Sequence, residues 1–459
     1  TPRSNRLAKM LPDHDNKVVV FGIQYFIHDF LMHAWNERFF WLNKEPIVRK
    51  YKERLDNALG VDKVSVDHIA ALHDLGYLPI RVKALPEGSR VPIGVPVLTI
   101  VNTHPDFFWL TNYFETILSL TVWLPCNSAT IAKEYRKILD NYAQETSSQL
   151  EFVDWQAHDF SMRGMAGLEA SILSSAGHLL SFTGTDTIPA IDFLEDFYNA
   201  DSSKELIGGS VAATEHSVMC MGTNTGEMET FKRLVTEVYP NGIVSIVSDT
   251  WDLWKVLTDY LPQLKQDILS RNGKVVIRPD SGDPVLIICG NPNGKTAEEK
   301  KGVIELLWET FGGKTNNKGF KELDEHIGAI YGDSITLQRA KDICEGLKNK
   351  GFASTNVVLG IGSFTYQYNT RDTFGFAMKA TYGEVNGEGR AIFKDPITDD
   401  GTKKSAKGLI KIIKENGSYK MIDNVSWEEE KDGELKEVFR DGKLLLDDSL
   451  SEIRERIQA

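Results

Sequence analysis

Short apolar runs that each end in Gly, Asp, Arg or Ser are the feature that most limits what this chain can fold into. Helical patterns separate them, for example over residues 252–270, 297–311 and 335–349. The clear runs are HLLSFTGTD (178–186), GIVSIVSD (242–249), KVVIRPDSG (274–282), GAIYGDS (328–334) and NVVLGIGS (356–363), with EFVDWQAHDF (151–160) as a sixth candidate. Apolar strands that alternate with helices are typical of parallel β/α units, which gather functional side chains at the carboxyl ends of the strands. We therefore predict a barrel-like β/α domain over residues 150–379.

The segments on either side of this domain have a different pattern. Residues 18–35 begin β-rich and turn helical, 78–101 alternate apolar and polar residues as antiparallel strands do, and 108–147 are helix-rich. From about residue 380 the chain returns to short strands and turns. Its 459 residues exceed the ~250–300 at which a single core stops growing. We predict an α/β fold in which residues 1–149 and 380–459 pack together as a mixed α/β domain beside an irregular, TIM-like β/α barrel.

Charge and composition argue against several classes of partner. The 52 Lys and Arg against 65 Asp and Glu give a net charge of −13, which disfavours a general nucleic-acid surface. No apolar run approaches the ~18 residues that a membrane helix needs. The four cysteines form no CxxC pair, as expected for reduced thiols in a cytosol-like compartment. We predict a cytoplasmic protein whose partners are small molecules, with no nucleic acid and no membrane.

Charged residues follow the predicted strands. They are Asp186, Asp249, Arg278, Asp280, Asp333 and Arg371. Carboxylates bind Mg²⁺ or a pair of ribose hydroxyls, and arginine binds phosphate oxygens through two parallel hydrogen bonds. This mixture suits a metal-bound phosphate, although barrel mouths carry polar residues whatever their function.

Two turns that contain glycine end late strands. They are Gly332-Asp333-Ser334 and Gly360-Ile361-Gly362-Ser363, and Arg371 follows the second. Exposed backbone N–H groups at such turns bind anions, and barrels often place phosphate at their last strands. A pair of tight turns without a ligand is the alternative. We favour a phosphate site, because both turns and Arg371 fit it together.

His216 is the histidine whose surroundings most suggest chemistry. With Glu215 and Ser217 it interrupts small, unbranched residues in SVAATEHSVMCMG (210–222). General acid/base catalysis, acceptance of a phosphoryl group and a structural role remain equally open from the pattern.

A second polar stretch, AHDFSMRG (157–164), follows the sixth strand candidate. His158 and Asp159 are close enough in sequence to Arg163 to share a loop with it. Phe160 either stacks on a flat ring or packs in the core.

Signature motifs of several enzyme classes are absent from the sequence. GNPNGKT (290–296) has three residues between its glycines where a phosphate-binding P-loop needs four, so we interpret it as a surface turn. No GxGxxG, HExxH or GxSxG element occurs. A reaction on a substrate that contains phosphate and ribose is the remaining interpretation.

Taken in order, the motifs resemble those of the nicotinamide phosphoribosyltransferases, a family of type II phosphoribosyltransferases. They are AHDFSMRG, FTGTDT, AATEHS, VSDTWD, IRPDSG, YGDS and the TRD of NTRDTFGF, with KALPEGSRVP and WLTNYFETIL before them and FKDP after them. The resemblance covers nearly the whole chain. It implies transfer of phosphoribose from phosphoribosyl pyrophosphate to the ring nitrogen of nicotinamide, giving nicotinamide mononucleotide and pyrophosphate in NAD salvage. Mg²⁺ would be the cofactor and ATP a co-substrate.

The resemblance also implies a role for each matching residue in the base pocket. Phe160 should stack on the nicotinamide ring, Asp186 should accept a hydrogen bond from its amide, and Arg278 should line the same pocket. The residues expected to hold the sugar and its phosphates are Arg163, Gly332, Asp333, Gly362 and Arg371.

The remaining matches concern catalysis and ATP. Asp249 and Asp280 match carboxylates that hold the ribose and the Mg²⁺-bound pyrophosphate, and His216 matches the histidine that the family phosphorylates with ATP to drive the reaction. Lys379 and Lys394 match basic residues near pyrophosphate or the ATP phosphates. The resemblance further implies a homodimer with its site at the interface, where Arg3 would reach the phosphates of the partner.

Two departures from the family pattern stand out. The chain begins with Thr and lacks the Asp-Ser-Tyr-Lys segment that lends an aromatic face to the neighbouring subunit, so we expect a trimmed beginning. Where the family often has a glycine-rich run, this chain has GIGSFTYQ (360–367), whose Ser363 and Phe364 would narrow the phosphate loop.

Two other functions remain alternatives. A nicotinate phosphoribosyltransferase would have the same architecture, but the anionic Asp186 favours an amide and repels a carboxylate. A non-catalytic nucleotide sensor would be expected to have lost His216, Asp280 or Arg278, and all three are present.

Overall fold

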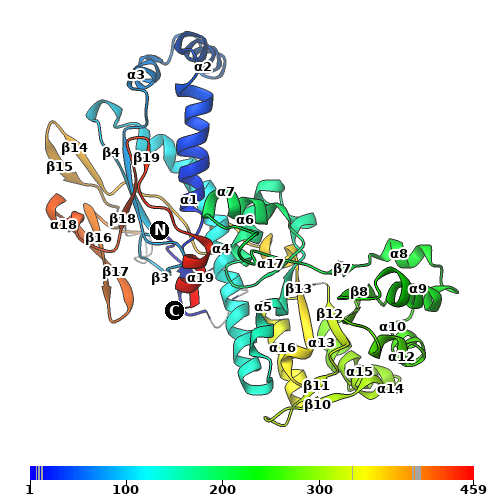
Figure 1. Ribbon diagram of the computed structural model, residues 1–459. Helices are drawn as coiled ribbons and strands as arrows, with labels where there is room; N and C mark the ends of the chain where they lie inside the picture. Colours follow the sequence, from blue (N-terminus) through cyan, green and yellow to red (C-terminus); the bar gives the residue numbers. More distant parts are fainter. Residues whose placement is uncertain are drawn as a thin grey trace.

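The computed structural model describes residues 1–6, 8, 11, 14–332, 334–394, 397–398 and 405–458. A large parallel sheet with its helices lies on one side of a long central helix, and antiparallel sheets lie on the other side (Figure 1). None of the helices in this part of the chain is long and apolar enough to cross a membrane.

The parallel sheet has seven strands among the described residues, in the order β6-β5-β13-β12-β9-β8-β7. They are β5 (Ala157–Asp159), β6 (Gly184–Thr185), β7 (Ala212–Ala213), β8 (Val244–Val247), β9 (Val275–Arg278), β12 (Ile327–Tyr331) and β13 (Val357–Ile361). Every neighbouring pair is parallel, so the carboxyl ends of all seven strands share one rim. β8 and β12 are buried along their whole length, which explains their runs of Val and Ile. The predicted α/β fold with a parallel sheet is confirmed.

The sheet curls until its two edges approach each other. The N–H of Thr185 donates to the carbonyl of Gly209 at 3.0 Å, and the N–H of Gly209 donates to the carbonyl of Thr183 at 2.8 Å. The same segment continues as β7, which pairs with β8. This described sheet has seven strands, whereas a TIM barrel has eight.

Two of the predicted strand runs are extended only at their ends, and here the prediction was wrong. α6 (Leu168–His178) continues to His178, so only the end of the run 178–186 is extended, as β6. Residues 151–156 form parts of η4 (Leu150–Phe152) and α5 (Val153–Gln156), and β5 follows them. A short apolar run has no periodicity that separates a buried helix from a buried strand, and tertiary packing decided both cases.

Helices connect the strands, and side-chain caps fix where several of them begin. Asp252 accepts from two backbone N–H groups at the start of α10 (Leu253–Lys255), Asp283 does the same for α13 (Pro284–Cys289), and Thr336 caps α16 (Leu337–Asn349). The other helices of this half are α7 (Pro189–Tyr198), α8 (His216–Met221), α9 (Glu227–Arg233), η6 (Leu234–Val238), η7 (Val256–Tyr260), α11 (Leu261–Gln263), α12 (Lys265–Leu269), α14 (Ala297–Lys301), α15 (Val303–Phe311) and α17 (Ser363–Tyr366). GNPNGKT lies between α13 and α14 as a turn, as predicted.

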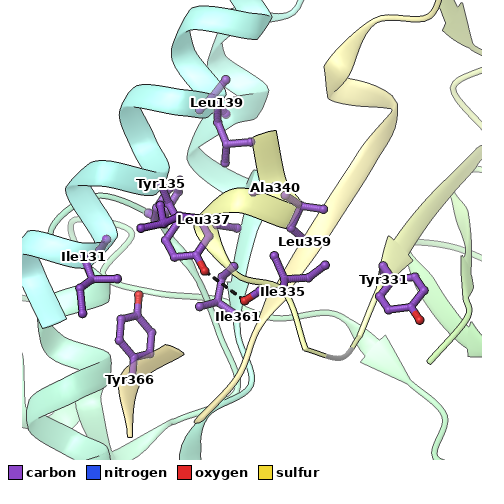
Figure 2. Packing of buried hydrophobic residues seen from close by; sticks show 14 of the residues in the cluster. Ile131, Tyr135, Leu139, Tyr331, Ile335, Leu337, Ala340, Leu359, Ile361 and Tyr366 are labelled. Carbon is purple, nitrogen blue, oxygen red and sulfur yellow. Dashed lines mark hydrogen bonds between the residues drawn. The ribbon is translucent and has the colours of Figure 1, made fainter. Parts of the chain in front are cut away.

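The central helix α4 (Leu110–Thr146) is 37 residues long and confirms the helix-rich stretch predicted over 108–147. Figure 2 shows its Ile131, Tyr135 and Leu139 facing α16 and β13 across the hydrophobic core. The buried Tyr135 hydroxyl donates to the carbonyl of Ile335 at 3.0 Å. Its one polar atom is therefore satisfied among apolar neighbours.

The first and last parts of the chain share an antiparallel sheet of order β19-β18-β2-β4. Its strands are β2 (Ile80–Ala84), β4 (Leu98–Asn102), β18 (Lys436–Arg440) and β19 (Lys443–Leu444). β18 comes from the C-terminal segment and pairs with β2 of the N-terminal segment. The two segments thus meet as the sequence suggested, while the domain boundaries at 149/150 and 379/380 stay a prediction.

The rest of this half consists of small sheets and helices. β1 (Lys17–Val19) pairs with β3 (Arg90–Pro92), β14 (Tyr382–Val385) with β15 (Glu388–Ala391), and β16 (Leu409–Glu415) with β17 (Ser418–Val425). A further hairpin, β10 (Gly313–Thr315) and β11 (Lys321–Leu323), lies in the other half. The helices are α1 (Ile23–Tyr25), η1 (Phe26–Ala34), η2 (Asn36–Phe40), α2 (Lys44–Leu59), α3 (Asp67–Leu75), η3 (Pro105–Phe107), α18 (Trp427–Lys431) and α19 (Leu450–Gln458), with η5 (Met162–Gly164) and η8 (Ser354–Asn356) near the parallel sheet.

Candidate active site

The residues that follow the parallel strands lie at the rim formed by the carboxyl ends. They are Phe160 after β5, Asp186 after β6, Asp249 after β8, Asp280 after β9 and Gly332 after β12. The structure therefore places Asp186, Asp249, Arg278 and Asp280 at one rim, four of the six side chains that the strand pattern suggested would converge there.

Phe160 and Arg278 form one wall of this rim. The guanidinium carbon of Arg278 lies 5.0 Å from the centre of the Phe160 ring, a cation–π contact. The ring of His158 lies 4.7 Å from the same ring. A Cβ on Gly360 would lie 2.7 Å from a carbon of that ring, so the glycine leaves the space that Phe160 occupies. Phe160 is only partly buried, which leaves it accessible to a flat ligand.

Asp186 stands beside this wall with two hydrogen-bond donors. His158 Nε2 lies 2.9 Å from Asp186 Oδ1, and the hydroxyl of Ser210 donates to the same oxygen at 2.6 Å. Burial raises the pKa of Asp186, but the hydrogen bond and charge of His158, then Ser210 and Arg278, outweigh it and leave the pKa below its usual value. The side chain is 48% exposed, so this carboxylate can accept a further hydrogen bond.

Asp249 and Asp280 are joined through the loop after β9. Asp249 Oδ2 accepts from the N–H of Asp280 at 2.8 Å, the N–H of Ser281 at 2.7 Å and the hydroxyl of Ser281 at 2.6 Å. The other carboxylate oxygen, Asp249 Oδ1, is buried and accepts no hydrogen bond, and Asp280 Oδ1 is in the same state. Two buried carboxylate oxygens with no protein donor can accept hydrogen bonds from hydroxyl groups or coordinate a cation.

Gly332 lets Asp280 and Arg278 come together. A Cβ at position 332 would lie 2.5 Å from Asp280 Oδ1 and 3.0 Å from Arg278 Nε. Arg278 Nε is also buried without an acceptor. The carboxylate oxygen and the guanidinium nitrogen therefore both border the backbone of Gly332.

His216 is the first residue of α8, directly after the β7 segment. Its Nε2 lies 3.6 Å from Asp249 Oδ1, beyond a hydrogen bond but close enough for charge interaction. The His216 side chain is 49% exposed, whereas that of Asp249 is 5% exposed. An accessible imidazole thus stands next to a buried carboxylate.

Arginines lie on the segments that follow β5 and β13, which are neighbouring strands. Arg163 is exposed on η5, and the exposed Arg371 is paired with Asp372 at 2.9 Å. Arg3 reaches this region from the start of the chain, since its Nε donates to the carbonyl of Gly375 at 3.2 Å. Gly362, the residue before α17, has open space where a Cβ would be.

The remaining predicted residues are not joined to the rim. Lys379 and Lys394 are exposed, and among the described residues no recorded contact links either one to the strand-end side chains. Lys394 flanks the β14–β15 hairpin, which Figure 1 places across the molecule from β7 and β8. Asp333 lies outside the described residues.

Comparison with known proteins assigns the chain to a family. A model of the nicotinate phosphoribosyltransferase (NAPRTase) family matches residues 155–443. The nicotinamide phosphoribosyltransferase of Acinetobacter baylyi is 56% identical over 464 residues, covering 100% of this chain and 91% of that protein. The chain belongs to the nicotinate phosphoribosyltransferase family. The resemblance inferred from its motifs is confirmed.

Two further comparisons give lower identities. The nicotinamide phosphoribosyltransferase of Mycoplasma pneumoniae is 41% identical over 342 residues, covering 72% of this chain and 71% of that protein. A crystal structure of human nicotinic acid phosphoribosyltransferase is 15% identical, with a TM-score of 0.48 over 98% of this chain and 87% of that one. That structural likeness is too loose to support an argument about this chain.

The site of this family member fits Mg²⁺ in one respect. The buried Oδ1 atoms of Asp249 and Asp280 are hard oxygen donors of the kind that Mg²⁺ takes alongside substrate phosphates. A cluster of three potential metal ligands does occur in the described part of the chain, at His14, Asp15 and Glu134, and it includes none of the strand-end carboxylates.

Ser210 lies in the site, and the sequence analysis did not predict it as a site residue. It was noted only as the start of the stretch around His216, because serine is common in loops. The one signal was its position directly after Gly208 and Gly209, where the chain has to pass close to β6. Only the curl of the sheet brings Ser210 to Asp186.

Proposed function

We propose that this protein transfers phosphoribose from phosphoribosyl pyrophosphate to nicotinamide, giving nicotinamide mononucleotide and pyrophosphate in NAD salvage. It is then a pentosyltransferase, like its relatives that are named for this reaction and are 56% and 41% identical to it. The geometry of the rim supports the choice of acceptor.

The observation that carries the proposal is the state of Asp186. Its pKa is lowered, and the half-exposed carboxylate is bonded to His158, whose ring packs against that of Phe160. A carboxamide offers N–H donors to such a group, whereas the carboxylate of nicotinate would place two negative charges side by side. This arrangement favours nicotinamide.

Each group of residues at the rim then binds a different part of the substrates. Phe160 and Arg278 hold the flat ring, and Asp186 fixes its rotation through the amide. Asp280 and Asp249 offer free carboxylate oxygens to the ribose hydroxyls and to Mg²⁺. Arg163 and Arg371, with the backbone of Gly332, Asp333 and Gly362, bind the phosphates.

Catalysis by these residues is positioning and charge compensation. Cleavage of the bond to pyrophosphate leaves positive character on the sugar and negative charge on the leaving group, so no strong protein nucleophile is needed. Mg²⁺, when bound, supplies positive charge that neutralises the pyrophosphate. The buried carboxylates balance the charge on the sugar side.

We also propose that ATP phosphorylates His216 and so drives the reaction forward. The imidazole is half exposed and lies beside Asp249, so a donor phosphate can reach it. A phosphoryl group there would add negative charge next to the pyrophosphate site. Lys379, Lys394 and Arg3 would balance that charge.

A homodimer is the assembly that we propose for this enzyme. The resemblance to the family supports it, and Arg3 of one copy would then reach the phosphates bound by the other. A cytoplasmic location remains our prediction from the composition.

The test is product formation from phosphoribosyl pyrophosphate and Mg²⁺ with nicotinamide or nicotinate, each with and without ATP. We expect nicotinamide mononucleotide as the main product and a stimulation by ATP that is lost in His216→Ala. Preference for nicotinate would refute the argument from Asp186. Turnover of neither base would favour the nucleotide sensor.

A further inference from the structure

Asp159 is a fully buried carboxylate beneath the base pocket, and our account of catalysis does not use it. Its Oδ1 accepts from the N–H of Ser161 at 3.0 Å and from the hydroxyl of Ser161 at 2.6 Å. Its Oδ2 accepts from the hydroxyls of Thr185 and Thr187, each at 3.0 Å. Both oxygens are thus held by two donors each.

These donors come from the residues that flank the two pocket side chains. Asp159 and Ser161 stand on either side of Phe160, and Thr185 and Thr187 stand on either side of Asp186. The backbone adds a further link, because the N–H of Asp186 donates to the carbonyl of Asp159 at 3.1 Å. One carboxylate therefore joins the turn after β5 to the turn after β6.

The pattern of donors is more specific than a buried charge needs for its own satisfaction. Any four donors would compensate the charge, but these four fix the two turns relative to each other. Thr187 N–H also donates to Thr185 Oγ1 at 2.9 Å, so the β6 turn is held from two directions. The side chain of Asp186 projects from the middle of that turn.

We propose that Asp159 is a positioning residue for the base pocket, setting the separation of the Phe160 ring and the Asp186 carboxylate. The proposal rests on the proposed function, since it assigns the base to this pocket. Asp159 itself touches no substrate. Its loss should therefore weaken binding of the base and leave binding of phosphoribosyl pyrophosphate unaffected.

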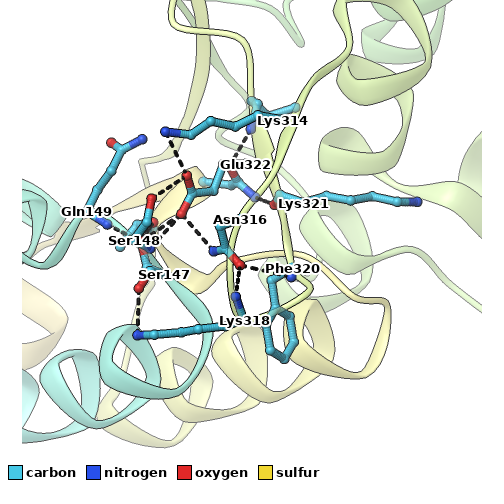
Figure 3. A network of polar contacts seen from close by, with 12 residues as sticks. Ser147, Ser148, Gln149, Lys314, Asn316, Lys318, Phe320, Lys321 and Glu322 are labelled. Carbon is cyan, nitrogen blue, oxygen red and sulfur yellow. Dashed lines mark hydrogen bonds and ion pairs between the residues drawn. The ribbon is translucent and has the colours of Figure 1, made fainter.

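A matched control exists at the opposite ends of the strands. Glu322 is also buried, and its carboxylate accepts from Ser148 N at 2.6 Å, Ser148 Oγ at 2.8 Å and Asn316 Nδ2 at 2.9 Å (Figure 3). This network joins the end of α4 to the β10–β11 hairpin. Loss of its charge disturbs a comparable set of hydrogen bonds, and none of them involves the residues that flank Phe160 and Asp186.

The experiment compares Asp159→Asn with Glu322→Gln in the full chain. For each we would measure melting temperature, kcat, and the KM values for nicotinamide and for phosphoribosyl pyrophosphate. We expect Asp159→Asn to raise the nicotinamide KM about tenfold while the other KM stays within about twofold, because misplaced contacts remove binding of the base alone. Glu322→Gln should lower the melting temperature and change neither KM.

A milder variant covers the case in which Asp159→Asn does not fold. Thr187→Val keeps the shape of the side chain and removes one donor to Asp159. It should raise the nicotinamide KM by about threefold, a smaller effect of the same kind. Hydrogen exchange followed by mass spectrometry should show faster exchange in residues 157–165 and 183–190 for both pocket variants and not for Glu322→Gln.

Two results would overturn the proposal. Equal changes in both KM values, or a nicotinamide KM raised as much by Glu322→Gln, would reduce Asp159 to a structural role. Unchanged exchange in 157–165 and 183–190 would show that the turns do not depend on it. Failure of the proposed function looks different, since the wild-type protein itself would then not use nicotinamide, and the exchange data would still decide whether Asp159 holds the two turns.

Discussion

Because Gly332 has no side chain, Asp280 Oδ1 and Arg278 Nε can lie close to its backbone. Asp249 Oδ2 accepts hydrogen bonds from the loop that carries Asp280, whereas Asp249 Oδ1 accepts none. Asp186 is likewise oriented by His158 and Ser210 before any ligand arrives. The site residues thus fix one another's positions. A substitution that adds a single methyl group should therefore have a large effect on activity.

Gly332→Ala should lower kcat/KM by about 100-fold, because the new Cβ has to displace Asp280 or Arg278 by an appreciable fraction of an ångström. The melting temperature should change little, since position 332 lies at the rim. Steady-state kinetics and thermal unfolding check this. Gly383→Ala, where a Cβ would lie 3.4 Å from its nearest neighbour in an exposed hairpin, is the control. Near-normal kinetics for Gly332→Ala would contradict the crowding argument.

His178 should make stability depend on pH. Burial lowers its pKa from near 6.5 to about 4, and the neutral ring bridges the Tyr366 hydroxyl and the carbonyl of Gly184. Between these pH values the unfolded chain binds a proton that the folded protein excludes, so the contribution of His178 to stability is lost as pH falls from about 6.5 to about 4.

The measurement is the difference in unfolding free energy between wild type and His178→Gln, taken from urea titrations across this pH window. The advantage of the wild type should shrink by roughly 2–3 kcal/mol from neutral pH to the acid end. Taking the difference removes the opposite slope of Glu87, whose pKa burial raises to about 7. A difference that does not vary with pH would rule out the buried, neutral histidine.

Among the elements, the C-terminal helix α19 has a direct link to the base pocket. Arg454 donates to the carbonyls of Leu179 and Leu206, each at 3.0 Å, and to that of Ile207 at 2.6 Å. Three residues after Ile207 comes Ser210, which holds Asp186. A helix at the end of the chain therefore fixes, through backbone carbonyls, the segment that closes the edge of the parallel sheet.

Arg454→Met should raise the nicotinamide KM about threefold to tenfold, because the 206–210 segment loses two hydrogen bonds from a charged donor. A lower melting temperature should accompany it. Glu455→Gln, an exposed position on the same helix, should match the wild type in both measurements. If Arg454→Met lost stability but kept its KM, the link from α19 to the pocket would be purely structural.

At the scale of the whole molecule, the two ends of the chain are held together by a buried charge cluster as well as by a sheet. Glu430 Oε1 accepts from Lys83 Nζ and from Arg81 Nη2, both at 3.0 Å, and Glu430 and Lys83 are 4% and 5% exposed. The contact joins α18 to β2, and the two residues Lys83 and Glu430 are 347 positions apart in the sequence. It lies on the far side of α4 from the parallel sheet.

Glu430→Gln should destabilise the protein by about 3 kcal/mol, because Lys83 is left buried without its counter-ion. Chemical denaturation gives this value, and the nicotinamide KM of the folded enzyme should not change. Glu428→Gln on the same helix removes an exposed pair with Lys431 and should have no measurable effect. A loss below about 1 kcal/mol would mean that Lys83 finds another partner or water.

The sequence by itself determined the α/β class, the run of strands ending in polar residues and the family. β8, β9, β12 and β13 were recognisable as short apolar runs, because none of their residues is exposed to solvent. The family followed from motifs whose residues, such as those around Phe160, Asp186 and Arg278, are read without any geometry.

Tertiary structure alone decided how those residues act on one another. Residues 151–156 and 178 are helical in the tertiary structure, and a short apolar run does not encode the difference between a helix and a strand. Ser210 meets Asp186 only because the sheet curls, and Arg454 meets Ile207 only because α19 packs beside it. Such pairings depend on contacts between residues far apart in the chain, and local sequence patterns carry no information about those.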